Sequence, residues 1–105
     1  MSSGDPAPRK VVITGIAGRL GRVVARALHH DPSFVLEGLD RRDFLERPKD
    51  VVHHQVDMRS KKARDVFRHG DVAALVHMGL MHDPRASAAD VYSWNVTGTM
   101  KLLEY

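Results

Sequence analysis

Three glycines at three-residue intervals constrain the fold of this chain more than any other feature of its sequence. Gly15, Gly18 and Gly21 follow a β-branched run, and the stretch after them has apolar residues at i, i+3, i+4, i+7 and i+8. The β-branched run predicts a strand over residues 10–14 that is buried on both faces. The apolar spacing predicts a helix over residues 19–30. The glycines therefore lie in a turn from a strand to a helix.

The rest of the chain alternates between the same two kinds of element. Its patterns predict strands over residues 34–39, 51–56 and 72–78, and helices from Ser60 to Gly70 and from residue 87 to the end. Strands that alternate with helices favour a parallel sheet, and right-handed crossovers give the strand order 3-2-1-4. We therefore expect an α/β protein with a Rossmann-type parallel sheet and helices on both faces.

The sequence predicts no fifth strand beyond residues 72–78. The fourth strand would then present an apolar sheet edge, which is a site for pairing with another chain. The first residues are polar and rich in proline, so we expect a disordered leader over residues 1–9 and a single domain over residues 10–105. A homo-oligomer and a complementary C-terminal half are the two expected ways of covering the edge.

The glycine turn also has the composition of a phosphate-binding site. Gly15 can make the sharp turn, Gly18 can let a pyrophosphate approach the backbone, and Gly21 can let the helix pack against the strand. The first N–H groups of a helix then bind the anion. The alternative is a glycine-rich connection that binds no ligand.

Two carboxylates favour a ligand. Asp40 ends the second strand 19 residues after Gly21, close to the spacing of about 20 at which an acid meets the ribose hydroxyls of a dinucleotide. Asp57 follows the third strand and can reach an adenine amino group. Both lie at the carboxyl ends of parallel strands, where such sheets bind ligands. Together with the glycines they predict a site for a dinucleotide cofactor.

Ordered motifs along the chain resemble those of the extended short-chain dehydrogenase/reductases of the NAD-dependent epimerase/dehydratase type. Residues 14–21, TGIAGRLG, match the TGxxGxxG spacing of that family. Residues 75–79, LVHMG, resemble its fourth-strand VxHxAA motif, with Met78 and Gly79 as departures. Residues 95–105, NVTGTMKLLEY, resemble its NVxGTxxLLEA helix. The resemblance covers essentially the whole chain after the leader.

The resemblance implies that residues 10–105 are only the N-terminal portion of a Rossmann domain, truncated before its fifth strand. It implies that this portion is the cofactor-binding part of an epimerase, dehydratase or reductase that acts on a nucleotide sugar or a similar hydroxylated substrate. It also implies individual roles. The residues around the pyrophosphate would be Gly15, Ala17, Gly18, Arg19, Leu20 and Gly21. Asp40 would hold the adenosine ribose, and Asp57 and Met58 would flank adenine. Met78 and Gly79 would line the nicotinamide-side ribose, and Asn95 would organise the region beneath the nicotinamide.

The choice between NAD and NADP depends on the end of the second strand. The Asp40 carboxylate accepts a hydrogen bond from a 2′-hydroxyl and repels a 2′-phosphate, which favours NAD. Arg41 and Arg42 follow it and can instead clamp that phosphate. NAD is the predicted cofactor, and NADP is the alternative.

The sequence predicts no catalytic residue. The family resemblance calls for a tyrosine followed four residues later by a lysine, but Val96 follows Tyr92 by four and Tyr105 is the last residue. We therefore expect the chain by itself to be catalytically incomplete. The alternative is a non-catalytic module that senses a dinucleotide or docks a partner.

Composition excludes several classes of protein. The chain contains no cysteine, which excludes disulfide scaffolds, thiolate metal sites and cysteine nucleophiles. Its basic residues are scattered, although the net charge is +3, so we expect no specific nucleic-acid partner. No apolar run approaches the roughly 20 residues that span a bilayer. We expect a cytoplasmic protein with no membrane partner, and the spacing of the histidines predicts no metal site.

Overall fold

Four parallel strands form one sheet in the order β3-β2-β1-β4. The structure is a computed structural model and describes residues 7–105. The strands are β1 (Arg9–Thr14), β2 (Phe34–Asp40), β3 (Val52–Gln55) and β4 (Val72–His77). The predicted Rossmann-type sheet and its strand order are confirmed. Residues 1–6 of the predicted leader lie outside the described residues, and Arg9 already belongs to β1, so the sheet begins one residue earlier than predicted.

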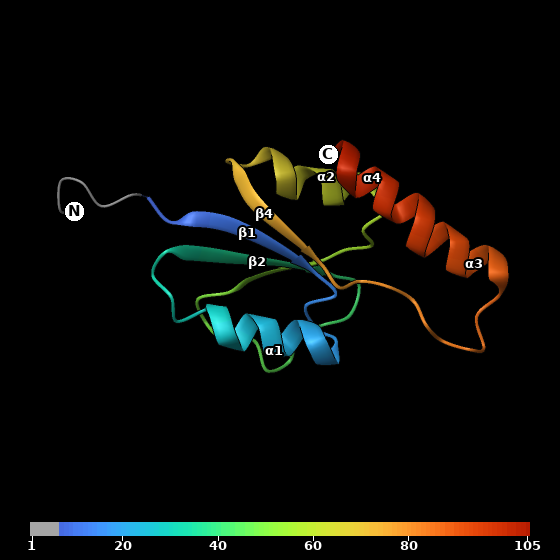
Figure 1. Cartoon of the computed structure of the whole chain (residues 1–105), viewed down its shortest axis with the longest axis horizontal. Coiled ribbons are helices and arrows are strands. Elements are labelled where there is room, and N and C mark those ends of the chain that lie inside the picture. The colour runs from blue at the N-terminus through green and yellow to red at the C-terminus, as the bar shows by residue number, and fades with distance from the viewer. Residues whose placement is uncertain (1–6) are drawn as a thin grey trace.

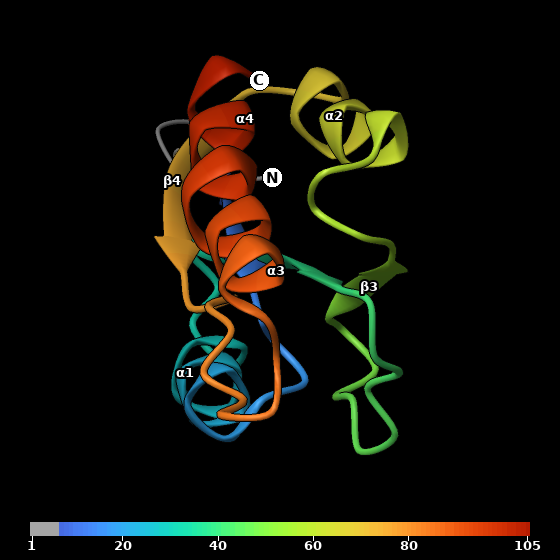
Figure 2. The ribbon, with the colours of Figure 1, turned by 90° about the vertical axis from the view of Figure 1, so that its right-hand side faces the viewer.

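Helices cover both faces of the sheet, as predicted. Figures 1 and 2 show α1 (Arg19–Leu28) on one side, with α2 (Lys61–Arg68) and the C-terminal helical segment on the other. That segment consists of α3 (Ala88–Tyr92), a π-helical turn η1 (Ser93–Thr97) and α4 (Gly98–Glu104).

The sheet has a hydrophobic core on each side because successive side chains of a strand point to opposite faces. Val11 and Ile13 of β1 pack with Ala25 of α1 in one core. Val12, between them in the sequence, packs in the other core, together with residues of α2 and the C-terminal helices such as Val66 and Leu102. The central strand is therefore buried on both faces, as its β-branched run predicted.

The C-terminal helix differs from the continuous helix that its periodicity predicts. The Gly98 N–H donates to the carbonyl of Ser93, five residues earlier, and so forms the wider turn of η1. Thr99 Oγ1 donates to the carbonyl of Asn95 at 2.5 Å, a local bond of the kind that bends helices. A Cβ on Gly98 would lie 2.8 Å from Met58 Cε, so the absent side chain lets α4 pack closely on that residue.

A predicted helix and a predicted strand were also longer than the elements in the structure. The structure ends α1 at Leu28, because Asp31 N–H bonds to the Leu28 carbonyl and Pro32 follows. It restricts β3 to Val52–Gln55, so Asp57 lies two residues beyond that strand.

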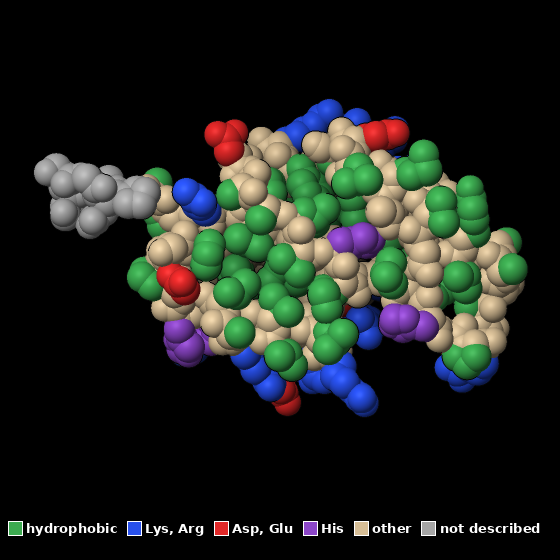
Figure 3. All heavy atoms as spheres, in the orientation of Figure 1, with side chains coloured by type: hydrophobic (Ala, Val, Ile, Leu, Met, Phe, Trp, Pro, Cys, Tyr) green, Lys and Arg blue, Asp and Glu red, His purple; other side chains and the backbone are tan. Residues whose placement is uncertain are grey.

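The edge of the sheet formed by β4 is open within the described residues. Within residues 7–105, β4 pairs with β1 alone, and Ala73 and Ala74 of β4 are exposed. Figure 3 shows hydrophobic side chains spread over this face of the molecule and along the C-terminal helices. None of the helices in the described part of the chain combines the length and the apolar character needed to cross a membrane.

Candidate functional site

A cavity of about 500 Å³ opens at the carboxyl ends of β1 and β2 and beside the loop after β4. Open α/β sheets bind ligands at this edge, and the volume lies within the roughly 300–1,000 Å³ of small-molecule sites. Most of the predicted site residues line it, namely Gly15, Gly18, Arg19, Leu20, Gly21, Asp40, Arg41, Met58, Met78 and Gly79. Ala17, Asp57 and Asn95 do not line the cavity.

Each glycine of the turn meets a different geometric requirement. Gly15 has a φ of +67°, a conformation that side chains disfavour. A Cβ on Gly21 would lie 2.1 Å from the Gly15 carbonyl oxygen, so only glycine lets α1 pack on the turn. A Cβ on Gly18 would lie 3.0 Å from the Arg42 guanidinium and 3.2 Å from the Gly15 carbonyl oxygen. Gly18 lines the cavity, and the nearest neighbour of such a Cβ would be the end of the flexible Arg42 side chain.

The start of α1 is uncapped and lies at the cavity. Gly18 is the N-cap residue, no side chain caps the helix, and no acidic residue lies in its first turn. The first N–H groups of α1 therefore carry the positive end of the helix dipole, and no side chain of the helix itself neutralises it. Since Gly18, Arg19 and Leu20 line the cavity, the cavity provides the backbone donors that a phosphate group requires.

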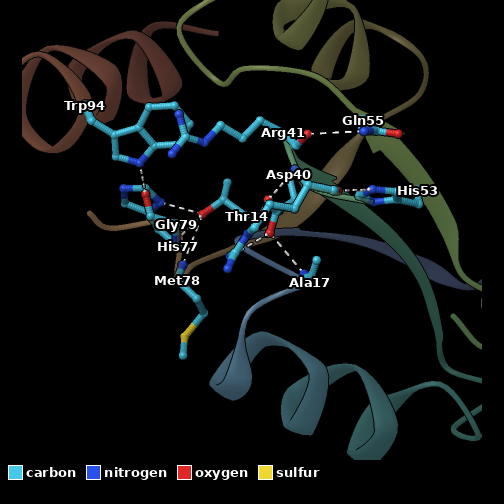
Figure 4. A network of polar contacts seen from close by, with 11 residues as sticks. Thr14, Ala17, Asp40, Arg41, His53, Gln55, His77, Met78, Gly79 and Trp94 are labelled. Carbon is cyan, nitrogen blue, oxygen red and sulfur yellow. Dashed lines mark hydrogen bonds and ion pairs between the residues drawn. The ribbon is translucent and has the colours of Figure 1, made fainter. Parts of the chain in front are cut away.

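Asp40 ties the turn to the sheet. Its side chain is only 4% exposed, and its Oδ2 accepts the Ala17 N–H at 3.0 Å. Oδ1 accepts the Arg42 backbone N–H at 2.9 Å, and the Arg42 guanidinium donates to both oxygens at 3.2 Å. Figure 4 shows Asp40 beside Ala17. The Arg42 side chain is 61% exposed, and both residues of this ion pair line the cavity.

A chain of hydrogen bonds joins β1, β4 and α4 behind the cavity. Thr14 Oγ1 accepts the N–H groups of Met78 at 3.0 Å and Gly79 at 3.1 Å. A hydroxyl has two lone pairs, so its own proton goes to His77 Nδ1, 2.5 Å away. His77 then carries its proton on Nε2 and donates it to Thr99 Oγ1 at 2.7 Å. Burial lowers the pKa of His77, which favours this neutral form.

Sequence reasoning did not identify this network as part of the site. Thr14 and His77 lie in two separate motifs, and they meet because they are register partners in the β1·β4 pair. The network holds Met78 and Gly79, which line the cavity, against the end of β1 (Figure 4).

The π-helical turn η1 supplies two side chains to the loop after β4. Asn95 Oδ1 accepts the Met81 N–H at 2.7 Å, and its Nδ2 donates to the Met81 carbonyl at 2.9 Å. Trp94 Nε1 donates to the carbonyl of Gly79. The helical stripe predicted Trp94 to be a core residue, and it is buried, but it also lines the cavity. Asn95 is therefore placed to shape the cavity wall through the loop.

Asp57 is paired with a residue that the sequence analysis did not single out. Arg59 Nη2 donates to Asp57 Oδ2 at 2.6 Å, and the Arg59 backbone N–H donates to Oδ1 at 2.8 Å. These bonds lower the pKa of Asp57. The adenine contact predicted for this carboxylate stays a prediction. Across residues 7–105, no three His, Asp or Glu side chains are grouped so that they could hold a metal ion.

Comparisons with known proteins place the chain in a family. The family model described as "NAD dependent epimerase/dehydratase family" matches residues 11–105. Uronate dehydrogenase from Agrobacterium tumefaciens is similar in structure, with a TM-score of 0.75 and 24% identity over 94% of this chain and 36% of that one. A search of curated proteins found no significant match.

Two further solved structures were determined with NAD. A short-chain dehydrogenase/reductase superfamily protein from Agrobacterium tumefaciens with bound NAD has a TM-score of 0.75 and 27% identity, over 91% of this chain and 28% of that one. UDP-glucuronic acid 4-epimerase from Bacillus cereus, in complex with UDP-glucuronic acid and NAD, has a TM-score of 0.75 and 19% identity, over 90% of this chain and 35% of that one. The chain thus spans about a third of the length of these relatives. The family match confirms the resemblance seen in the motifs, and this chain belongs to the NAD-dependent epimerase/dehydratase family.

Proposed function

We propose that this chain binds NAD as the cofactor-binding portion of an oxidoreductase of the epimerase/dehydratase type. The observation that carries the proposal is the uncapped start of α1 at Gly18, which lines the same cavity as the buried Asp40. A pyrophosphate needs a turn without side chains and with free N–H groups. A ribose needs a carboxylate within reach of those groups. The residues present therefore fit the cofactor.

Each part of the cavity has a proposed role. The N–H groups at the start of α1 would bind the pyrophosphate, and Asp40 would accept hydrogen bonds from the adenosine ribose. Met78 and Gly79 would form the wall beside the second ribose, held by Thr14. When bound, NAD supplies hydride acceptance and donation. The chain's own residues bind and orient the cofactor, and no residue of the sequence is proposed to transfer a proton.

We propose NAD rather than NADP as the preferred cofactor. A 2′-phosphate would bring negative charge against the Asp40 carboxylate, which is largely shielded from water. The Arg42 guanidinium is already bonded to both oxygens of that carboxylate, so the positive charge of Arg42 is partly neutralised and attracts a 2′-phosphate less strongly. The family description and the two NAD-bound relatives support the same cofactor.

For the full-length protein, we propose a nucleotide sugar or a similar hydroxylated compound as the substrate. The support comes from relatives, which include a uronate dehydrogenase and a UDP-glucuronic acid 4-epimerase.

Titration calorimetry of the purified chain tests the cofactor proposal. NAD should bind more tightly than NADP, and Asp40→Ala should weaken NAD binding. Asp65→Ala is the matched control because Asp65 is an exposed acid on α2, outside the cavity. Circular dichroism establishes that each variant is folded. A folded chain that binds no NAD would contradict the proposed function.

The open edge of β4 favours a second candidate function, that of a partner-docking module. β4 pairs on one side only within the described residues, and Leu80, in the loop that follows it, is 47% exposed. A second copy of the chain, or a complementary C-terminal half, would cover this edge. Sedimentation of the purified chain should then show self-association that Ala73→Lys weakens, because a lysine on an edge strand opposes pairing. A monomer at all concentrations would argue against self-pairing.

A further inference from the structure

We propose that Arg41, backed by Trp94, is the platform on which the adenine ring of the dinucleotide stacks. This inference rests on the proposed function. The Arg41 Cζ lies 4.9 Å from the centroid of the Trp94 ring. Arg41 follows β2 and Trp94 belongs to η1, so the pair joins opposite walls of the cavity that both residues line (Figure 4).

Trp94 is held in place from two directions. Its Nε1 donates to the Gly79 carbonyl, which fixes the plane of the ring. The Arg59 Cζ also lies 4.9 Å from the ring centroid. Arg59 is itself held by Asp57 and by Ser93 Oγ, to which its Nη1 donates at 3.0 Å. The indole is therefore a rigid support, and Trp94 acts as a positioning residue for Arg41.

The Arg41 guanidinium differs from those of Arg42 and Arg59, which are paired with carboxylates. Arg42 is bonded to Asp40 and Arg59 to Asp57. The Arg41 guanidinium makes no hydrogen bond or ion pair with the part of the chain that the structure describes. It lies over the Trp94 ring, and its charge adds to the bonds from Arg59 in lowering the pKa of Asp57. A planar guanidinium stacked on one aromatic ring keeps its other face available for a second planar group. Because Arg41 lines the cavity, we infer that a planar ligand is bound on that face.

The position and charge of Arg41 select adenine rather than nicotinamide. Arg41 is the residue after Asp40, the proposed ribose ligand, and Met58 lines the same cavity. The base joined to that ribose would therefore lie next to Arg41. Adenine is neutral and stacks on guanidinium groups, whereas the oxidised nicotinamide ring is positively charged and would be repelled by an arginine.

Fluorescence of Trp94 tests this inference directly, since Trp94 is the only tryptophan in the chain. Excitation at the red edge of indole absorption avoids absorption by adenine. ADP-ribose should change the emission of Trp94 because it packs against the guanidinium that covers the ring. Nicotinamide mononucleotide, which has no adenine, should leave the emission unchanged.

Arg41→Ala is the decisive variant because the residue is exposed and its loss should not disturb the fold. Calorimetry should show a loss of about 2–5-fold in ADP-ribose affinity, the size of an exposed cation–π contact, with no loss for nicotinamide mononucleotide. Arg26→Ala, which removes an exposed arginine of α1 outside the cavity, should change neither. Trp94→Phe keeps an aromatic support and should preserve most of the affinity.

The binding experiments distinguish failure of adenine stacking on Arg41 from failure of NAD binding. If ADP-ribose binds the wild-type chain and Arg41→Ala equally well, the stacking platform is wrong and the proposed cofactor site stands. An equal emission change with nicotinamide mononucleotide would also overturn the assignment of adenine. If the folded chain binds neither NAD nor ADP-ribose, the proposed function itself is wrong.

Discussion

Replacing Gly21 by alanine tests how closely α1 is packed on the glycine turn. The added Cβ would lie 2.1 Å from the Gly15 carbonyl oxygen and 2.7 Å from Ile16 Cα. The turn has little room to retreat, because Gly15 N–H is bonded to the Leu39 carbonyl at 2.9 Å. On its other side, the position of a Gly15 Cβ is only 2.7 Å from the Met78 backbone. The helix must therefore move instead.

The sign of the stability change separates two effects. Carbon–oxygen contacts of this kind lie at about 3.3–3.6 Å, so α1 must move by roughly 1 Å. Overpacking of this sort costs about 1–3 kcal/mol, whereas alanine in place of glycine inside a helix stabilises by at most about 1 kcal/mol. We expect a net loss of about 1–2 kcal/mol and a fall in the thermal midpoint of about 4–16 °C.

Thermal and urea unfolding, followed by circular dichroism, measure this change. Gly70→Ala is the matched control, since Gly70 has a φ of +84° and its Cβ would have no neighbour within 4 Å. It should lose about 1 kcal/mol from backbone strain and keep its NAD affinity in calorimetry, whereas Gly21→Ala should lose NAD affinity as well as stability. A Gly21→Ala protein that is as stable as the wild type or more so would refute the packing argument.

Three other predictions follow from single contacts. Asp40→Ala should lower the free energy of unfolding by about 1–3 kcal/mol, because buried donors lose their acceptor, and Asp40→Asn should lose less in urea unfolding. Ser87 Oγ accepts the Asp90 N–H at 3.1 Å, so Ser87→Ala should destabilise by about 1 kcal/mol. Ser60→Ala should cost less, because the Ser60 hydroxyl donates to a carbonyl and does not cap α2. Burial lowers the pKa of His77 from 6.5, so its contribution to stability should be complete above pH 6.5 and be lost as the pH falls toward the folded-state pKa. Nitrogen-15 NMR should find the His77 proton on Nε2, and His77→Gln should flatten this pH dependence; a proton on Nδ1 would contradict the proposed direction of the hydrogen-bond chain.

Local patterns determined the arrangement of the elements. The alternation of Val11, Val12 and Ile13 into two cores requires only the period of a strand. The positions of Gly15, Gly18 and Gly21 relative to strand and helix were enough to predict the turn, and the handedness of crossovers was enough to predict the strand order. These features depend on residues close in the sequence or on general chirality, so the sequence alone specified them.

Other features depended on the folded chain. The π-helical turn at Ser93–Thr97 has no periodic signature because it consists of a single turn. Thr14 meets His77 only through the register of two strands that are distant in the sequence. Arg41 and Arg59 both meet Trp94 through the folded chain, and of these two only Arg59 is paired with a nearby carboxylate. The sequence determined which turn and which strand ends form the proposed dinucleotide site. Only the tertiary structure decided which side chains support and cover that site, because such contacts are set by register and side-chain packing between distant segments.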